Sequence, residues 1–357
     1  MTAESPAPPD VLPAPVTGAQ AWYGPDMADR DEWLYTLDAH ELAEIDAAMR
    51  PLVARKADIA QMRRSDFPLP VLSRRLERIR HDLLHGRGFA VLRGLPVTHW
   101  SRREAATAYF GLGLHLGNPR SQNAAGHVLG HVCDLGRSLD DPATRTYQTA
   151  ERQTFHTDSV DVVGLLCLQT ARRGGESLLA SSMTIYNEMY RQRPDLLRVL
   201  FEPFATDRRG EVPAGKKPHF RIPVFSWYQA YLSCMFARRY IESAQRFADV
   251  APLRSQHRAA LDMFERLAED PSIHLHLEFR PGDMQFVHNH TMVHDRTAFE
   301  DWPEPDRRRH LLRLWLAVDG ARPLPPVYAE RYGSVAIGDR GGIVVPGTRM
   351  QAPVEPG

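Results

Sequence analysis

The stretch 155–170 reads FHTDSVDVVGLLCLQT. Its larger part, residues 160–170, is a nearly continuous apolar run rich in valine and leucine, which is typical of a buried β-strand. Directly before this run, His156 and Asp158 stand two residues apart. Because side chains alternate between the two sides of an extended chain, this spacing places an imidazole and a carboxylate on the same side of one strand.

A second run, residues 289–294 with the sequence NHTMVH, carries further histidines far along the chain. An imidazole that reached His156 and Asp158 from this run would complete a set of two histidines and one carboxylate. Such a set binds Fe(II) on one face and leaves the other coordination positions open for a co-substrate and O₂. The sequence therefore predicts an iron site that two distant segments build together.

The overall composition bears on the class of partner and on the compartment. Lys plus Arg and Asp plus Glu both number 44, so no net charge draws the chain to nucleic acid or to a membrane surface. No apolar run is long enough to span a bilayer. Cys133, Cys167 and Cys234 form no paired motif, which favours free thiols in a reducing compartment. We expect a cytoplasmic protein with a small-molecule partner and no nucleic-acid or membrane partner; a homo-oligomer stays open.

The chain divides into four segments by composition. Residues 1–20 are rich in Pro and Ala and predict a disordered tail, without the basic and apolar regions of a secretory signal. Residues 21–87 predict a helical segment that packs on the core. Residues 88–337 predict a strand-rich domain with lid insertions, and residues 338–357 an irregular C-terminal tail.

Hydrophobic periodicity predicts the elements inside these segments. Asp38 with Glu41 three residues later is typical of a helix N-terminus, and the residues that follow have one apolar face. The other elements follow from the spacing of apolar residues between glycine and proline boundaries. Helices are expected at 70–85, 103–114, 184–193 and 253–269, and strands at 88–94, 160–170, 176–181, 273–280, 284–288 and 310–318.

The order of these elements favours one architecture. Strands arrive singly and in pairs between long connections, and no Gly-x-Gly-x-x-Gly or Gly-Lys-Ser/Thr run marks a nucleotide-binding βαβ unit. We therefore expect an α+β fold, mainly β, with a double-stranded β-helix (jelly roll) as its core and helices packed outside. The mouth of such a barrel is where a metal site would lie.

Five short segments carry a family resemblance. They are HTD at 156–158, GGES at 174–177, PGD at 281–283, HDRTAF at 294–299 and RHLLRLWL at 309–316. Read in this order, they resemble the taurine dioxygenase-like (TauD/TfdA) branch of Fe(II)- and 2-oxoglutarate-dependent oxygenases, close to its clavaminate synthase-like members. The resemblance runs from about residue 88 to residue 316.

The resemblance implies a dioxygenase in which His156, Asp158 and His294 hold Fe(II) and perform the catalytic role of the site. It also implies 2-oxoglutarate and O₂ as co-substrates, release of succinate and CO₂, and oxidation of a substrate C–H bond. Related halogenases replace the carboxylate ligand by a small residue. The retained Asp158 therefore favours hydroxylation, or a related desaturation or cyclisation, over halogenation.

The same resemblance implies residues that bind 2-oxoglutarate. Arginine suits the distal carboxylate because its planar fork can reach both oxygens. Arg309 and Arg313 lie four apart on a predicted strand, so they share one face; Arg309 is the better match to the family pattern. Arg313 would bind the same carboxylate or an acidic substrate. Ser177 stands where relatives often carry Thr and could donate its hydroxyl to the same group.

The sequence says less about the substrate. Two candidate lid segments, 117–147 and 204–231, hold a mixture of polar, cationic and aromatic residues. This mixture suits a small polar molecule such as an amino acid or its derivative. The residues are Gln122, Asn123, Arg145, Tyr147, Arg221, Trp227 and Tyr228.

Three alternatives stay open. A jelly-roll hydrolase or isomerase that uses Zn or Mn would need no keto acid, and a non-catalytic binding protein could keep the same fold. Additional histidines also allow a second metal site: a helix would bring His290 and His294 together, with His288 nearby. A strand over this segment is favoured instead, and it argues against a second site.

Overall fold

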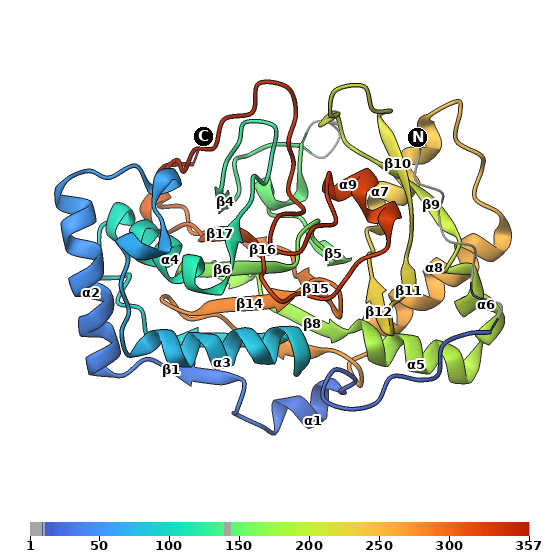
Figure 1. The fold of residues 1–357 in the computed structure, drawn as a ribbon, viewed down its shortest axis with the longest axis horizontal. Helices are drawn as coiled ribbons and strands as arrows, with labels where there is room; N and C mark the ends of the chain where they lie inside the picture. Colours follow the sequence, from blue (N-terminus) through green and yellow to red (C-terminus); the bar gives the residue numbers. More distant parts are fainter. Residues whose placement is uncertain (1–8, 10, 139–143, 357) are drawn as a thin grey trace.

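The computed structural model describes residues 9, 11–138 and 144–356. Within them, the largest sheet has seven strands, and the long apolar strand β6 lies near its centre (Figure 1). Both neighbours of β6 run antiparallel to it. The order is β1 (Leu34–Thr36), β2 (Phe89–Arg93), β14 (Met284–His288), β6 (Val162–Gln169), β17 (His310–Ala317) and β3 (Asn118–Pro119), with β4 (Leu129–Val132) also paired to β17.

A second sheet of four strands packs against the first. Its order among the described residues is β13 (Leu275–Leu277), β8 (Ser177–Ser181), β15 (Met292–Arg296) and β5 (Gln153–His156). Apolar side chains from both sheets form one cluster between them, among them Val163 and Trp315 from the large sheet and Leu179 and Met292 from the small one. Two-stranded pairs complete the structure: β9 (Pro203–Asp207) with β10 (His219–Pro223), β11 (Phe225–Tyr228) with β12 (Tyr231–Cys234), and β7 (Arg173–Gly174) with β16 (Phe299–Glu300).

Helices cover the outer faces of the two sheets. The outer face of the large sheet packs against α2 (Ala39–Ala54), α3 (Leu72–His85) and α4 (Arg102–Leu116). The small sheet packs against α5 (Ser182–Gln192), α6 (Pro194–Val199) and α8 (Ser255–Ala268) on the other side of the molecule (Figure 1). The short helices are α1 (Gly24–Ala28), α7 (Arg238–Ser243) and α9 (Ala329–Tyr332).

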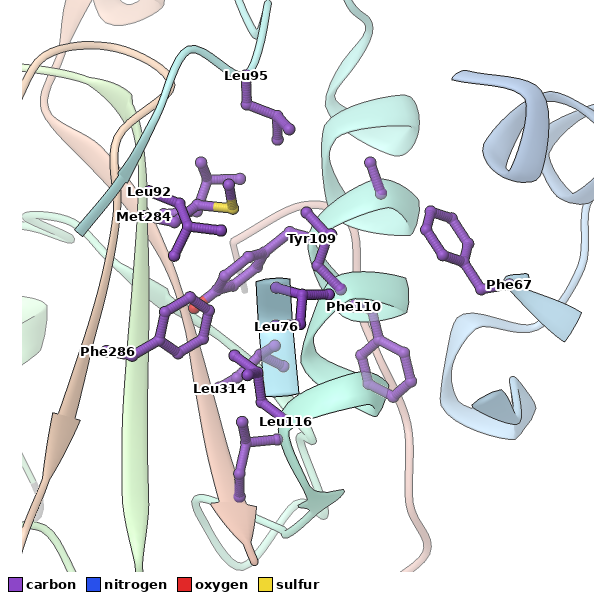
Figure 2. Packing of buried hydrophobic residues seen from close by; sticks show 14 of the residues in the cluster. Phe67, Leu76, Leu92, Leu95, Tyr109, Phe110, Leu116, Met284, Phe286 and Leu314 are labelled. Carbon is purple, nitrogen blue, oxygen red and sulfur yellow. The ribbon is translucent and has the colours of Figure 1, made fainter. Parts of the chain in front are cut away.

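Figure 2 shows how closely α4 packs on the large sheet. Tyr109 of α4 faces Phe286 of β14, with their ring centroids 6.3 Å apart. On the other side of α4 lies the ring of Phe67, and a Cβ atom on Gly111 would come within 2.4 Å of it. Glycine at this position therefore lets a phenylalanine ring lie directly on the helix backbone, which helps to fix α4 against the sheet.

Most predicted elements are confirmed, but the expected balance of the fold is wrong. Asp38 and Glu41 form the capping box that starts α2, and α3, α4, α5 and α8 lie where helices are expected. The described chain contains at least as much helix as strand, so "mainly β" underrates the helices. The fold is mixed, because each sheet needs a helical layer to bury its outer face.

The N-terminal tail differs from expectation. Residues 11–20 have no regular structure, but Leu12 is buried in the apolar cluster around α5. Asn187 of α5 accepts a hydrogen bond from the N–H of Val16 at 2.8 Å. The prediction of disorder is therefore wrong for residues 11–20, since α5 offers both apolar surface and hydrogen-bond partners; residues 1–8 and 10 lie outside the described residues.

The C-terminal segment 338–356 runs back across the molecule without helix or strand of its own (Figure 1). Its backbone bonds to loops near the small sheet, with Gly342 N–H donating to Ser159 O at 2.9 Å and Ile343 N–H donating to Ser121 O at 2.8 Å. Arg340 is fully buried and forms an ion pair with Asp161 at 2.8 Å. This segment is thus tied to the residues that follow β5.

Among residues 9, 11–138 and 144–356, no helix combines the length and the apolar character that crossing a bilayer requires.

Candidate active site

Sheet register brings the two distant histidines together. Strands β5 and β15 pair antiparallel, and His156 lies directly opposite His294. Their ring centroids are 4.2 Å apart, and His294 Nε2 lies 3.8 Å from Asp158 Oδ2. One donor atom from each of the three side chains lies within 4.8 Å of the others. The three residues therefore form one compact group of donor atoms, as the sequence predicts.

Asp158 reaches this group by a different route from the one expected. Strand β5 ends at His156, so Asp158 does not share a strand with it. Instead, the N–H of Asp158 donates to Asn289 Oδ1 at 2.9 Å. Trp315 of β17 donates from Nε1 to Asp158 Oδ2 at 2.9 Å. Hydrogen bonds from the turn between β14 and β15 and from β17, and not strand alternation, therefore place this carboxylate.

The protonation states of the group suit a divalent cation. Burial lowers the pKa of His294 to about 3, and the neighbouring His156 adds to the lowering. Burial alone would raise the pKa of Asp158, but Arg313 and the two imidazoles hold it below its usual value. Near pH 7 the group thus has a neutral His294 imidazole and an ionised carboxylate, which are the forms that bind metals.

The hydrogen bonds of His156 fix which nitrogen faces inward. His156 Nδ1 lies 2.8 Å from the carbonyl oxygen of Thr154. Because a carbonyl oxygen only accepts hydrogen bonds, Nδ1 must carry the proton and donate it. The other nitrogen, Nε2, is then an acceptor, and it lies 2.9 Å from the side-chain amide nitrogen of Gln153. An imidazole whose outer nitrogen is bonded to a carbonyl presents its inner lone pair to a cation, as metal-binding histidines commonly do.

Arg309 lies beside this group as a buried, unpaired cation. It directly precedes β17, where a bulge shifts the register between His310 and Leu311. The residue is 3% exposed. Its Nη2 donates to Gly175 O at 3.3 Å, and its Nη1 is buried with no partner among the described residues. Burial lowers its pKa to about 10, so the guanidinium is charged near neutral pH and has donors free for an anion.

Gly175, the second glycine of the GGES segment, has a steric role at Arg309. Gly175 has φ +77°, and a Cβ atom there would come within 2.7 Å of Arg309 Nε. A larger residue would therefore meet both an unfavourable backbone conformation and the guanidinium. Gly175 is needed for Arg309 to lie where it does.

Ser177 and Arg313 line the same cavity as Arg309, but both already have partners. The hydroxyl of Ser177 donates to Gln285 Oε1 at 3.1 Å. Arg313 donates from Nε to Gln122 Oε1 at 2.7 Å, and its Nη1 lies 3.8 Å from Asp158 Oδ2. The site residues predicted from sequence thus lie together in space. Of Arg309, Arg313 and Ser177, only Arg309 has a buried donor without a partner among the described residues.

A larger cavity adjoins the histidines and extends away from Arg309. Of the seven residues expected in the lids, three line it and four do not. Arg221 lies on β10, Trp227 and Tyr228 lie on β11, and Asn123 lies in a turn. Other residues that line the cavity come from outside the expected lid segments and were not predicted from the sequence. Those that line it as expected are Gln122, Arg145 and Tyr147, and those missed include Gln153, Tyr240, Arg331 and Ile343.

The additional histidines are held by other contacts. His290 Nε2 lies 2.9 Å from Asp161 Oδ1, and the same carboxylate pairs with Arg340. His288 Nδ1 lies 2.9 Å from Thr291 Oγ1. In the part of the chain that the structure describes, His156, Asp158 and His294 are the only group of three metal-binding side chains. His290 therefore belongs to a buried polar network, and the alternative of a second metal site has no support there.

These buried imidazoles predict a loss of stability in mild acid. Burial lowers the pKa of His290 to about 4 and that of His310 to about 3, from an ordinary value of 6.5. Below pH 6.5 the unfolded chain binds protons at both positions and the folded chain does not, so stability falls as the pH drops. At pH 5 each residue should cost about 2 kcal/mol, at about 1.4 kcal/mol per pH unit.

Urea denaturation at pH 7 and pH 5 measures this difference. Replacement of His310 by asparagine should reduce the difference between the two pH values by about 2 kcal/mol, the share that this one imidazole contributes. An unfolding free energy that is equal at both pH values would contradict the assignment of these imidazoles as neutral in the folded state.

Comparison with known proteins agrees with this geometry. Residues 50–315 match the family model described as "Taurine catabolism dioxygenase TauD, TfdA family". The FR-33289 synthase of Streptomyces rubellomurinus is 34% identical over 337 residues, which cover 92% of this chain and 98% of that protein.

Two solved structures have a similar fold. An asparagine oxygenase in complex with Fe(II), 2S,3S-3-hydroxyasparagine and succinate has a TM-score of 0.61 and 18% identity, with 80% of this chain and 93% of that chain covered. The non-heme iron oxygenase OrfP in complex with Fe, succinate and (3S)-hydroxy-L-Arg has a TM-score of 0.59 and 15% identity, with 79% and 94% covered. At these identities the likeness concerns the fold alone. The extent of the family match and of the 34% identical relative shows that this chain belongs to the TauD/TfdA family of Fe(II)- and 2-oxoglutarate-dependent dioxygenases.

Proposed function

We propose that His156, Asp158 and His294 bind Fe(II) and that Arg309 binds the distal carboxylate of 2-oxoglutarate in the adjoining cavity. The observation that carries this proposal is the compact donor group next to a buried arginine with an unpartnered Nη1. Two neutral imidazoles and one carboxylate suit Fe(II). A buried guanidinium with a free donor suits a carboxylate.

When bound, Fe(II) with 2-oxoglutarate and O₂ supplies the oxidising power for C–H cleavage, with succinate and CO₂ as products. The protein then has to orient the reactants and exclude water. Asp158 is held from two sides by Asn289 and Trp315. Val163, Leu165 and Leu311 line the cavity next to Arg309, and this apolar wall strengthens the attraction between the guanidinium and a carboxylate.

Arg309 is a better candidate than Arg313 for the 2-oxoglutarate carboxylate. The charge of Arg313 is already close to Asp158, and its Nε is occupied by Gln122. Arg309 forms no ion pair with any described residue. Ser177 would assist Arg309 if its hydroxyl turned from Gln285 toward the co-substrate. Arg313, which lines both cavities, would lie between co-substrate and substrate.

We also propose that the two packed sheets form a double-stranded β-helix. Antiparallel pairing within each sheet, the apolar cluster between them and the fold of the two solved oxygenases support this architecture. The candidate iron ligands would then lie at one end of the barrel, where β5 and β15 meet the residues after β5.

The substrate that we propose is a small polar molecule such as an amino acid or its derivative, and the reaction is hydroxylation, with desaturation or cyclisation as variants. The solved structures of similar fold hold 3-hydroxyasparagine and 3-hydroxyarginine. The cavity beside the histidines is lined by a mixture of polar, charged and aromatic side chains. Asp158 would hold the position that related halogenases leave open for a halide, which favours hydroxylation over halogenation.

Two measurements test this function. Addition of Fe(II) and 2-oxoglutarate without O₂ should produce a weak visible charge-transfer band. A screen of amino acids and their derivatives should then identify compounds that raise succinate formation above the rate without substrate, with His156→Ala as the inactive control. A protein that forms no band and no succinate would instead favour a Zn or Mn enzyme or a binding protein.

The hydrogen bond from Trp315 to Asp158 gives a further prediction. Trp315→Phe keeps an aromatic ring in the inter-sheet cluster but removes the Nε1 donor. Loss of a group that orients a ligand typically lowers metal affinity by roughly 10- to 100-fold. We expect a weakening near the lower limit, measured by titration of Fe(II) against the visible band. Trp302→Phe, at a tryptophan that packs on exposed Arg307, should leave the affinity unchanged.

A further inference from the structure

The side-chain amide of Gln153 occupies the nitrogen of His156 that a metal would need. Gln153 Nε2 lies 2.9 Å from His156 Nε2. Because His156 Nδ1 carries the ring proton for the carbonyl oxygen of Thr154, Nε2 offers a lone pair and the amide donates to it. One lone pair cannot accept an N–H and bind a metal at the same time. Metal binding at His156 therefore requires the amide of Gln153 to turn away.

An irregularity in strand β5 brings Gln153 to the side of the sheet that carries His156. A spacing of three residues places two side chains on opposite faces of a regular strand. Here His156 pairs with His294. Gln153 pairs with Arg296, so three steps along β5 match two steps along β15. The extra residue of this bulge reverses the alternation, and bulges commonly redirect a side chain beside an active site in this way.

The amide of Gln153 is free to turn because a single hydrogen bond holds it. Among the described residues, the amide has no hydrogen-bond partner other than His156. Gln153 is partly buried and lines both the cavity beside Arg309 and the larger cavity. A turn of its side chain therefore breaks one hydrogen bond and moves the amide into cavity space, without displacing packed core residues.

Arg313 and Tyr147 also line both cavities, but they are held in another way. Arg313 donates from Nε to Gln122 Oε1 at 2.7 Å. Its guanidinium lies 4.5 Å from the centre of the Tyr147 ring. These two side chains thus hold each other at the junction of the cavities. Of the three, only Gln153 has a hydrogen bond that ends on an imidazole nitrogen of the candidate metal site.

We propose that Gln153 is a positioning residue with two successive hydrogen-bond partners. Without a metal, its amide holds the His156 ring. With a metal on His156, the amide donates to the carboxylate at the metal-binding end of 2-oxoglutarate. This inference rests on the proposed function, because it needs His156 as a ligand and 2-oxoglutarate in a cavity that Gln153 lines. An acceptor on the metal lies next to the amide, and a hydrogen bond to a carboxylate is charge-assisted and strong.

Two affinities that should change in opposite directions test this inference. The first is the affinity for Fe(II) without 2-oxoglutarate and without O₂, measured by competition with a coloured chelator. Gln153→Met keeps an unbranched side chain of similar length but removes the amide, so no donor competes for the His156 lone pair. The variant should bind Fe(II) about 2- to 10-fold more tightly, which is the range for one net hydrogen bond.

The second is the affinity of the Fe(II)-loaded protein for 2-oxoglutarate, measured without O₂ from the visible band. Here Gln153→Met removes a donor to a carboxylate, so the affinity should fall about 10-fold, the lower end for a hydrogen bond to a charged group. A replacement that merely disturbed β5 would weaken both affinities. Gln256→Met, at an exposed glutamine of α8, is the matched control and should leave both unchanged.

A nuclear magnetic resonance measurement on the metal-free protein gives a readout that is independent of iron. The side-chain amide signal of Gln153 is identified in the isotope-labelled protein by its loss in Gln153→Met. Addition of diamagnetic Zn(II) should shift this signal, because the amide then leaves the His156 nitrogen. In the Gln256→Met spectrum the same signal should be present and should shift in the same way.

The outcomes separate this inference from the function on which it rests. Tighter Fe(II) binding and weaker 2-oxoglutarate binding by Gln153→Met, together with an amide signal that shifts with Zn(II), support it. Fe(II) binding that is weaker or unchanged in this variant overturns it, and so does an unchanged affinity for 2-oxoglutarate. An unmodified protein that binds no Fe(II) and forms no band overturns the proposed function itself.

Discussion

Replacement of His294 by alanine should lower succinate formation by more than about 100-fold, because loss even of a group that only orients a ligand costs roughly 10- to 100-fold. His294 faces His156 across the β5–β15 pair and lies close to Asp158. Alanine leaves the backbone pairing in place and removes one of three donor side chains. We expect the visible band with Fe(II) and 2-oxoglutarate to disappear together with activity, as measured in the same samples.

His276→Ala is the matched control for this substitution. His276 lies on β13 of the same sheet, but its side chain is exposed and takes no part in the donor group. The His276→Ala protein should show the same visible band with Fe(II) and 2-oxoglutarate, and the same succinate formation, as the unmodified protein. A His294→Ala protein that keeps the band at the same Fe(II) concentration would remove His294 from the proposed ligands.

Replacement of Arg309 by methionine should raise the KM for 2-oxoglutarate by roughly 100-fold or more, because loss of one partner of a buried ion pair costs about 3–5 kcal/mol. Methionine fills a similar volume and leaves no buried cation behind. The effect should fall on KM more strongly than on the binding of Fe(II), since Arg309 lies outside the donor group. Initial rates over a range of 2-oxoglutarate concentrations measure it.

Arg308→Met provides the comparison at the adjacent position. Arg308 is exposed in the turn before β17 and lines none of the cavities beside Arg309. Its KM for 2-oxoglutarate should stay unchanged. If instead Arg313→Met raised the KM and Arg309→Met did not, the roles proposed for the two arginines would have to be exchanged.

The local parts of this structure could be predicted from sequence because short-range rules control them. The capping box at Asp38 and Glu41 and the apolar run of β6 depend on neighbours along the chain, and both appear as expected. The grouping of His156, Asp158 and His294 was also predictable, since their residue types and order match the family pattern. The route by which Asp158 reaches the group was not, because Asn289 and Trp315 come from distant segments, the turn between β14 and β15 and strand β17.

The wall of the larger cavity could not be predicted by the same reasoning. Arg331 and Ile343 come from segments far beyond the last strand, and no periodicity connects them with the histidines. Their positions depend on tertiary contacts, such as the ion pair between Arg340 and Asp161. The packing of residues 11–20 on α5 was missed for the same reason: composition alone indicates disorder, and only a complementary surface elsewhere in the fold reverses it.

Strand β17 has a consequence for how the enzyme could acquire a new substrate. All eight of its residues are buried: Leu312, Leu314 and Leu316 pack toward α4, while Arg313 and Trp315 face the site. A strand with both faces occupied tolerates few replacements. Libraries for altered specificity should therefore leave β17 constant and vary the cavity wall contributed by residues 145–147 and 237–240, none of which is among the buried core residues.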